Sequence, residues 1–193
     1  MREGEAMSTN SKEAILAAAR RIAQARGYGG LNFRDLADQV GIKAASVYYH
    51  FPSKADLGAA VAKRYREDNA AALEVLAAET GDAAVSLKRY PETFRFALTN
   101  DNRMCLASFM AAEYDDLPEP IRAEIRAFAD VNVAWLAARV TEAKVVDAGQ
   151  SQARARAIFA AISGAQLMAR SRDDIALFDH IITDYQGVGL LPI

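Results

Sequence analysis

Cysteine, proline and long apolar runs are all scarce in this 193-residue chain. A single cysteine excludes an internal disulfide framework and is typical of a reducing compartment. No apolar run approaches the ~20 residues that a membrane-spanning helix needs. Five prolines and eleven glycines leave few helix breaks, and 52% hydrophobic residues can fill a sizeable core. We therefore expect an all-α protein located in the cytoplasm.

The chain also lacks a large excess of positive or negative charge, since its net charge is only −2 at pH 7. The charge is unevenly distributed, however. Residues 10–65 contain nine Lys and Arg against four Asp and Glu, a balance of +5, so the rest of the chain carries −7. A basic segment on an acidic body is the charge pattern of a nucleic-acid-binding head.

Residues 32–54, NFRDLADQVGIKAASVYYHFPSK, are the most informative stretch. Asn32 is a favourable N-cap for a first short helix, and Gly41 suits the turn that ends it. Residues 44–50 predict a second short helix. Ser53 then predicts the cap of a third, longer one. This spacing is typical of a helix-turn-helix motif at about residues 33–52, whose second helix enters the major groove of DNA.

The second short helix has an exposed polar-aromatic face. If Val47 and Phe51 point into the core, the helical period places the tyrosines and the histidine on the outside. Hydroxyl, imidazole and ammonium groups can all contact phosphate oxygens. The side chains that offer such groups are Lys43, Ser46, Tyr48, Tyr49, His50 and Lys54.

Helical periodicity predicts about nine helices in total. A disordered tail (1–9) precedes a first helix (11–26), which completes a three-helix DNA-binding domain (10–56). Asn10 and Glu13 form a plausible capping pair at its start. The remaining residues (57–193) predict a helical body for ligand binding and dimerisation, and Pro91 predicts a kink or split near Tyr90. The expected helices after the motif cover residues 53–78, 83–100, 104–113, 119–146, 151–170 and 173–186.

The last two helices, about residues 151–186, suit pairing with a second copy of the chain. Small side chains recur there at three- and four-residue spacing and would let helices approach closely. We expect a homodimer built on a four-helix bundle, or alternatively a face that packs only against the body. The stripe consists of Ala153, Ala157, Ala160, Gly164 and Met168.

Over residues 10–60 the chain resembles TetR-family transcriptional regulators, on the turn glycines, the core spacing, the Y-Y-H-F run and the Ser53-Lys54 helix start. The resemblance implies an all-α homodimer that binds a palindromic double-stranded DNA operator, with half-sites ~34–36 Å apart. It also implies an inducer pocket in the body and, most often, repression rather than activation. Two alanines open the recognition helix and can meet only thymine methyl groups. Matched by position, the implied DNA-binding residues are Arg34, Lys43, Ala44, Ala45, Ser46, Tyr48, Tyr49, His50 and Lys54.

The segment RMCLASFMAAEYDDLP resembles a subset of that family that includes the N-ethylmaleimide- and acrylate-responsive repressors, in some of which a cysteine senses electrophiles. Cys105 matches that cysteine, close to Arg103 and a predicted helix start, a setting that activates thiols. Alternatively, Cys105 is a buried small hydrophobe. A ligand in the body would shift the 53–78 helix and release the operator. The expected ligand-binding residues are Tyr90, Phe94, Met104, Cys105, Phe109, Asn132 and Trp135.

Two other classes of function remain open. An enzyme with a Cys-His nucleophile would need His50 or His180 beside Cys105, but these residues belong to different predicted elements. The sequence has no metal-spaced cluster and no glycine-rich phosphate loop, so we expect no enzyme activity, no metal and no cofactor. A DNA-free adaptor is the other alternative. Salt-dependent binding to a duplex would argue against it.

Overall fold

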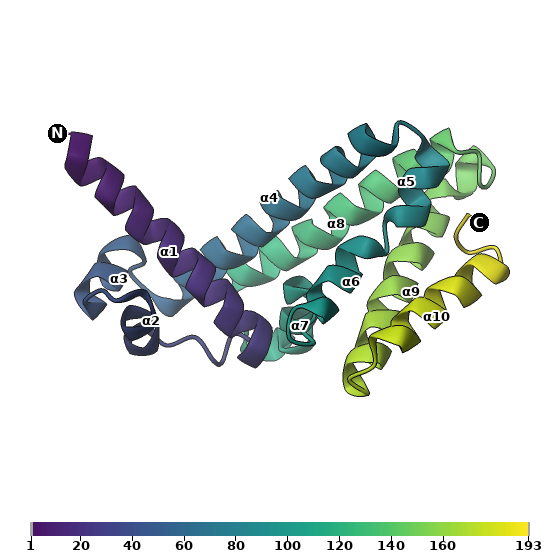
Figure 1. Cartoon of the computed structure of the whole chain (residues 1–193). Coiled ribbons are helices and arrows are strands. Elements are labelled where there is room, and N and C mark those ends of the chain that lie inside the picture. Colours follow the sequence, from purple (N-terminus) through teal and green to yellow (C-terminus); the bar gives the residue numbers. More distant parts are fainter. Residues whose placement is uncertain (1, 193) are drawn as a thin grey trace. The chain divides into compact units, whose positions relative to one another are not determined.

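Helices joined by turns and short loops make up the residues that the computed structural model describes, which are 2–192, with the side chains of 11–147 and 149–192 (Figure 1). The all-α fold predicted from the sequence is therefore confirmed. The α-helices are α1 (Arg2–Arg26), α2 (Phe33–Val40), α3 (Ala44–His50), α4 (Lys54–Thr80), α5 (Ala83–Arg89), α6 (Glu92–Thr99), α7 (Leu106–Ala112), α8 (Glu119–Glu142), α9 (Ser151–Ser171) and α10 (Ile175–Gly187). Two 3₁₀ turns cover Tyr114–Asp116 and Ala148–Gln150.

Local signals in the sequence set most helix ends. The Ser53 hydroxyl accepts the backbone N–H of Asp56 at 3.1 Å and donates to its carboxylate at 2.7 Å, so a reciprocal cap begins α4 as predicted. Gly81 has φ +60° and follows the last residue of α4. The predicted interruption at Pro91 divides the expected 83–100 helix into α5 and α6, because proline lacks a backbone donor. This split adds one helix to the nine expected.

The start of α1 differs from the prediction. Residues 1–9 were expected to form a disordered tail, and Asn10 and Glu13 to cap the helix, but the helical backbone extends back to Arg2. Residues 2–9 contain one glycine and no proline, so nothing in them stops a helix. Glu13 is instead paired with Arg64 of α4 at 2.6 Å, and these hydrogen bonds hold the pKa of Glu13 below its ordinary value.

The described helices form two packing units. The first contains residues 1–65 and 106–125, and the second contains residues 66–105 and 126–193. This differs from the predicted division into residues 10–56 and 57–193. The reason is tertiary packing: α7 and the start of α8 lie between two segments of the second unit in sequence but share an apolar core with α1 and α4. We call the first unit the head and the second the body.

The core of the head collects apolar side chains from six helices. In Figure 1, α2 and α3 lie beside α1. Gly58 of α4 lies against Ile121 of α8 and Tyr28, and a methyl group at Gly58 would lie 2.5 Å from the Ile121 Cδ1 atom. A larger residue at position 58 would therefore displace the buried Ile121 side chain from this close packing. The fully buried members of this core include Ile15, Ala19, Leu36, Val47, Leu57, Leu106, Met110 and Ile121.

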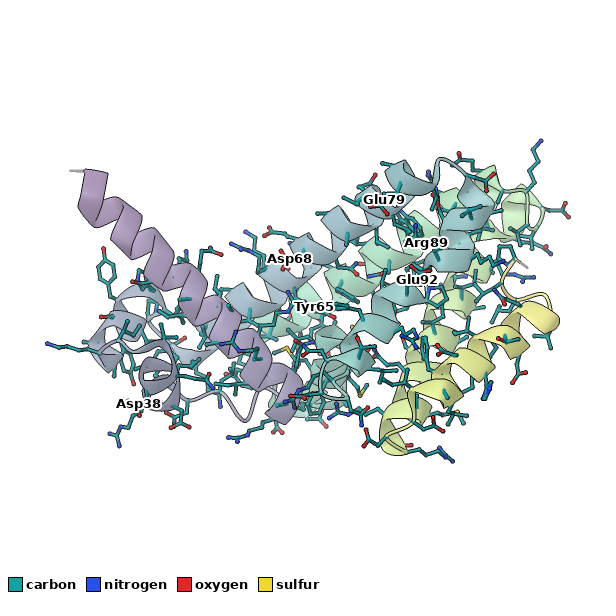
Figure 2. The ribbon with its side chains drawn as sticks, in the orientation of Figure 1. Asp38, Tyr65, Asp68, Glu79, Arg89 and Glu92 are labelled. Carbon is teal, nitrogen blue, oxygen red and sulfur yellow. The ribbon has the colours of Figure 1, made fainter. Side chains whose placement is uncertain are left out.

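In the body, α9 and α10 run antiparallel and pack side by side (Figure 1). Arg95 of α6 donates two hydrogen bonds to Asp179 of α10, at 2.7 and 2.9 Å, and these bonds lower the pKa of the Asp179 carboxyl group. Figure 2 shows Arg89 between Glu79 and Glu92, with ion-pair distances of 3.6 and 3.1 Å. These three residues connect the ends of α4, α5 and α6.

Length and hydropathy together distinguish these helices from membrane-spanning helices. Over the described part of the chain, no helix combines the length and the apolar character needed to cross a bilayer.

Candidate nucleic-acid interface

The turn between α2 and α3 is a helix-stop motif built on Gly41. Gly41 has φ +74°, a left-handed conformation that costs other residues about 1–2 kcal/mol. Its N–H donates to the Asp38 carbonyl at 3.3 Å, and the Ile42 N–H donates to the Ala37 carbonyl at 3.0 Å. This pair of bonds is the Schellman motif. At the other end of α2 the Asn32 side chain accepts two backbone N–H groups, at 2.8 and 3.3 Å, as predicted.

Val47 is the one buried residue of α3, and the other six residues of this helix are exposed or half-buried. Val47 is fully buried and Phe51, immediately after the helix, is 3% exposed, so these two residues anchor it. Tyr48 is 58% exposed and Tyr49 is 78% exposed. Two exposed tyrosines on a seven-residue helix are unusual, since aromatic side chains normally bury most of their area. The remaining predicted contacts are either exposed (Arg34, Lys43, Ala45) or half-buried (Ala44, Ser46, His50, Lys54).

Ring contacts orient the exposed aromatic side chains. The Tyr48 ring lies 4.7 Å from the Phe33 ring, centroid to centroid. The Tyr49 ring meets the His50 ring edge-on at 5.1 Å. Rings held in this way lose less conformational entropy when their polar ends bind a partner.

A groove of about 730 Å³ lies where α2, α3 and α4 begin. Lys54 at its edge is already engaged, because its ammonium group donates to the Gly29 carbonyl at 3.0 Å and lies 4.7 Å from the centroid of the Tyr28 ring. The sequence did not predict this second role of Lys54. The groove is lined by Leu31, Asn32, Phe33, Arg34, Asp35, Ala44, Tyr48 and Lys54.

An aromatic cluster fills the body where the sequence predicted a ligand site. The Tyr90 ring stacks on Trp135 at 5.7 Å and contacts Phe94 at 5.8 Å. The Tyr90 hydroxyl donates to the Asn132 Oδ1 atom at 2.9 Å, and the Asn132 Nδ2 atom donates to the Phe128 carbonyl at 2.8 Å. Asn132 therefore shares the apolar face of Phe128 and Trp135, as the spacing predicted.

Burial sets the charge state of this cluster. It raises the pKa of Tyr90 well above its ordinary value, and the neighbouring Cys105 adds to the effect. The tyrosine therefore stays a neutral donor to Asn132. Trp135 is 8% exposed, and its buried Nε1 atom has no hydrogen-bond partner among the described residues. A buried donor without an acceptor costs about 1–3 kcal/mol.

The other predicted ligand-binding residues divide between the two units. Met104 and Cys105 are buried in the body, and Gln166 accepts the Cys105 backbone N–H at 2.9 Å. Phe109 lies on α7 and belongs to the head, because α7 turns Leu106 and Met110 into the head core. The structure thus gathers six of the seven predicted residues in one unit. In the described part of the chain, no three His, Cys, Asp or Glu side chains are arranged to hold a metal ion.

Sequence reasoning missed Gln166. Its amide is fully buried, and its Nε2 atom donates to the Phe94 carbonyl at 2.6 Å. One signal was available, since Ile158, Ile162 and Gln166 recur every fourth residue and place a polar side chain on an apolar face. Phe159 was also missed. Its ring contacts those of Phe94 and Phe128 at 6.1 and 6.4 Å.

Comparisons with known proteins agree with this geometry. Residues 15–61 match the model of the family described as bacterial regulatory proteins, tetR family, and they cover α2, α3, the second half of α1 and the start of α4. The HTH-type transcriptional regulator LmrA of Bacillus subtilis is 28% identical over 150 residues, which are 76% of this chain and 77% of LmrA. A TetR-family regulator structure from Agrobacterium tumefaciens is 28% identical with a TM-score of 0.87, over 94% of this chain and 98% of that one.

Residues 15–61 form a tetR-family domain, and the whole chain has the fold of TetR-family transcriptional regulators. It is therefore a DNA-binding regulator rather than an enzyme, and the matched residues include α2 and α3. The reduced form of Escherichia coli NemR is 21% identical with a TM-score of 0.81, over 92% of this chain and 96% of NemR. At that identity the likeness shows a common fold and does not extend to NemR's chemistry.

The exposed tyrosine of α3 provides a direct test of the interface. Replacing Tyr49 by alanine should weaken operator binding about threefold to tenfold, because one hydrogen bond to the DNA backbone is lost. Replacing Tyr49 by phenylalanine should lose most of the same affinity if the hydroxyl group makes the contact. Mobility-shift titration measures both effects.

Phe96 is the matched control, because it is an aromatic residue of α6 in the body and is 71% exposed. Phe96→Ala should leave operator affinity unchanged. Equal affinities for wild type and Tyr49→Ala would exclude Tyr49 as a DNA contact.

Proposed function

We propose that this regulator is a homodimeric repressor that a small molecule or an electrophile, bound in the body, releases from its operator. The single observation that carries the ligand part is the buried Trp135 indole N–H, which has no hydrogen-bond partner in the described residues and lies in an aromatic cluster. A transcription assay on an operator-containing promoter would separate repression from the alternative, activation.

Exposed small and apolar residues on α9 support a dimer through α9 and α10. Leu167 and Met168 are 55% and 46% exposed, although both are large apolar side chains. They follow a stripe of exposed small residues at positions 153, 157, 160 and 164 on the same helix. Pairing of this face with its symmetry copy would bury the apolar side chains and bring the helices close together.

The chemistry of the cluster supports a planar ligand with a hydrogen-bond acceptor. Stacked Tyr90 and Trp135 rings favour a flat conjugated molecule. An acceptor on that molecule would satisfy the Trp135 N–H, and Asn132 could exchange its bond with Tyr90 for one with the ligand. Carbonyl-bearing aromatic compounds have both properties.

If the trigger is an electrophile, Cys105 is the residue that it would modify. Its side chain is buried, so a reagent would reach it only through a local opening of the body. Alkylation would add volume next to Tyr90 and Gln166. Either trigger must stabilise the released conformation more than the operator-bound one, and α4, which has residues in both units, would transmit the change.

Disrupting the α9 face should abolish tight operator binding. The double variant Leu167→Glu/Met168→Glu should be monomeric in sedimentation experiments, because four like charges would meet in the dimer. Its operator affinity should fall at least about a hundredfold, since the second half-site contact is no longer intramolecular. Val75→Glu, at a 55% exposed apolar position on α4, is the control and should stay dimeric. A dimeric double variant would contradict the proposed interface.

Trp135→Phe tests the ligand site, because it retains a ring and removes only the donor. One- and two-ring aromatic carbonyl compounds, with coumarin as the reference probe, should stabilise the wild type in thermal unfolding. Their affinity should fall about threefold to tenfold in Trp135→Phe, while operator affinity without ligand stays the same. Equal affinities in the two proteins would exclude the indole N–H. If the trigger is covalent, N-ethylmaleimide should release the wild-type protein from its operator in the same mobility-shift assay. The same reagent should leave the Cys105→Ser variant bound to the operator.

A further inference from the structure

The turn between α1 and α2 carries a contact that DNA recognition does not explain. The Glu113 carboxylate, directly after α7, accepts the backbone N–H of Tyr28 at 2.8 Å. The two residues are 85 positions apart in the chain and belong to the same unit, the head. A charged acceptor makes this a stronger hydrogen bond than one between neutral groups.

The Tyr28 N–H is available because of how α1 ends. Gly27 has φ +68°, and its N–H donates to the Ala23 carbonyl at 2.9 Å. This single bond is the αL form of helix stop, which leaves the next N–H without a helical acceptor. At the end of α2, by contrast, Ile42 fills the equivalent position with a bond inside its own helix. The α1 stop is therefore incomplete without Glu113.

Steric fit confirms that the carboxylate is closely packed. A methyl group at Gly27 would overlap the Glu113 carboxylate carbon and both of its oxygens. Gly27 thus serves two purposes, a left-handed turn and a place for Glu113. No sequence pattern connects the two residues.

The other side of the same turn is held by α4. Lys54 donates to the Gly29 carbonyl at 3.0 Å and lies over the Tyr28 ring. The α1–α2 turn, residues 27–30, is thus fixed between a carboxylate from α7 and an ammonium group from α4. Two residues later Asn32 caps α2, so the turn sets where the helix-turn-helix begins.

α7 follows directly on Cys105, the last residue of a body segment. Leu106 and Met110 are fully buried in the head core. Cys105, the residue before α7, has its backbone N–H bound to Gln166 in the body. A covalent path of nine residues therefore runs from the Cys105 N–H to the Glu113 carboxylate.

We propose that Glu113 is a positioning residue for operator binding: it fixes the α1–α2 turn, and through α7 it makes that turn respond to the Cys105 segment. Glu113 touches no DNA in this role. A competing account treats Glu113 as a surface negative charge that repels DNA. The two accounts predict opposite signs for its removal.

Three variants distinguish the accounts, measured with a duplex selected by the wild type. Glu113→Ala removes the acceptor and should weaken operator binding about tenfold. Glu113→Gln keeps an amide oxygen for the Tyr28 N–H and should stay within about twofold of wild type. Asp116→Ala, at an exposed acid three residues along the chain, removes the same charge and should bind at least as tightly as wild type. Tighter binding by both Glu113 variants would overturn the proposal.

Amide exchange of Tyr28 gives a readout that does not depend on DNA. The Tyr28 N–H should be protected in wild type and in Glu113→Gln, and should exchange at least about tenfold faster in Glu113→Ala. An unprotected Tyr28 amide in the wild type would overturn the proposal even if Glu113→Ala failed to fold. Protection together with failed operator binding would instead count against the DNA-binding function.

The response to the Cys105 segment is tested from its other end. Gln166→Met retains the side-chain volume and removes the bonds to both Cys105 and Phe94. It should speed exchange of the Tyr28 amide and weaken operator binding, and neither effect should add to that of Glu113→Ala in the double variant. Additive effects would show that α7 does not connect the two positions, and would overturn that half of the proposal.

Discussion

The apolar core of the head determines where α3, the exposed second helix of the helix-turn-helix, lies. Helix α3 has seven residues, and its anchors are Val47 and the following Phe51, so α3 is too short to hold its own position. Its placement comes from α1, α2 and the start of α4, and these in turn pack on Leu106 and Met110 of α7. DNA recognition in this protein therefore depends on packing that reaches far beyond the helix-turn-helix motif.

Hydrogen bonds at two turns add to the apolar core in positioning α2 and α3. Gly41 closes the α2–α3 turn with bonds from its own helix, whereas the α1–α2 turn borrows Glu113 from α7 and Lys54 from α4. The α2–α3 turn is thus determined by neighbouring residues, whereas the α1–α2 turn depends on residues far away in the sequence.

The sequence predicted the features whose causes are local. Asn32, Gly41, Ser53 and Pro91 each act within a few residues, and the helix ends beside them lie where they were expected. It also predicted that Asn132 would share a face with Trp135, because helical period alone decides this. It could not predict that residues 106–125 join the head, since nothing in their periodicity says which core they fill. The sequence also could not predict the Glu113–Tyr28 and Gln166–Cys105 hydrogen bonds, because each joins residues far apart in the chain.

The central claim is that two copies of α3 bind one operator together. Selection of bound duplexes from a random pool by the purified protein, at about 0.15 M salt, tests it most directly. The enriched duplexes should contain an inverted repeat whose half-site centres are ~34–36 Å apart, and each duplex should bind at least two chains in sedimentation experiments. Enrichment of a single unrepeated site bound by one chain, or no enrichment at all, would contradict the account.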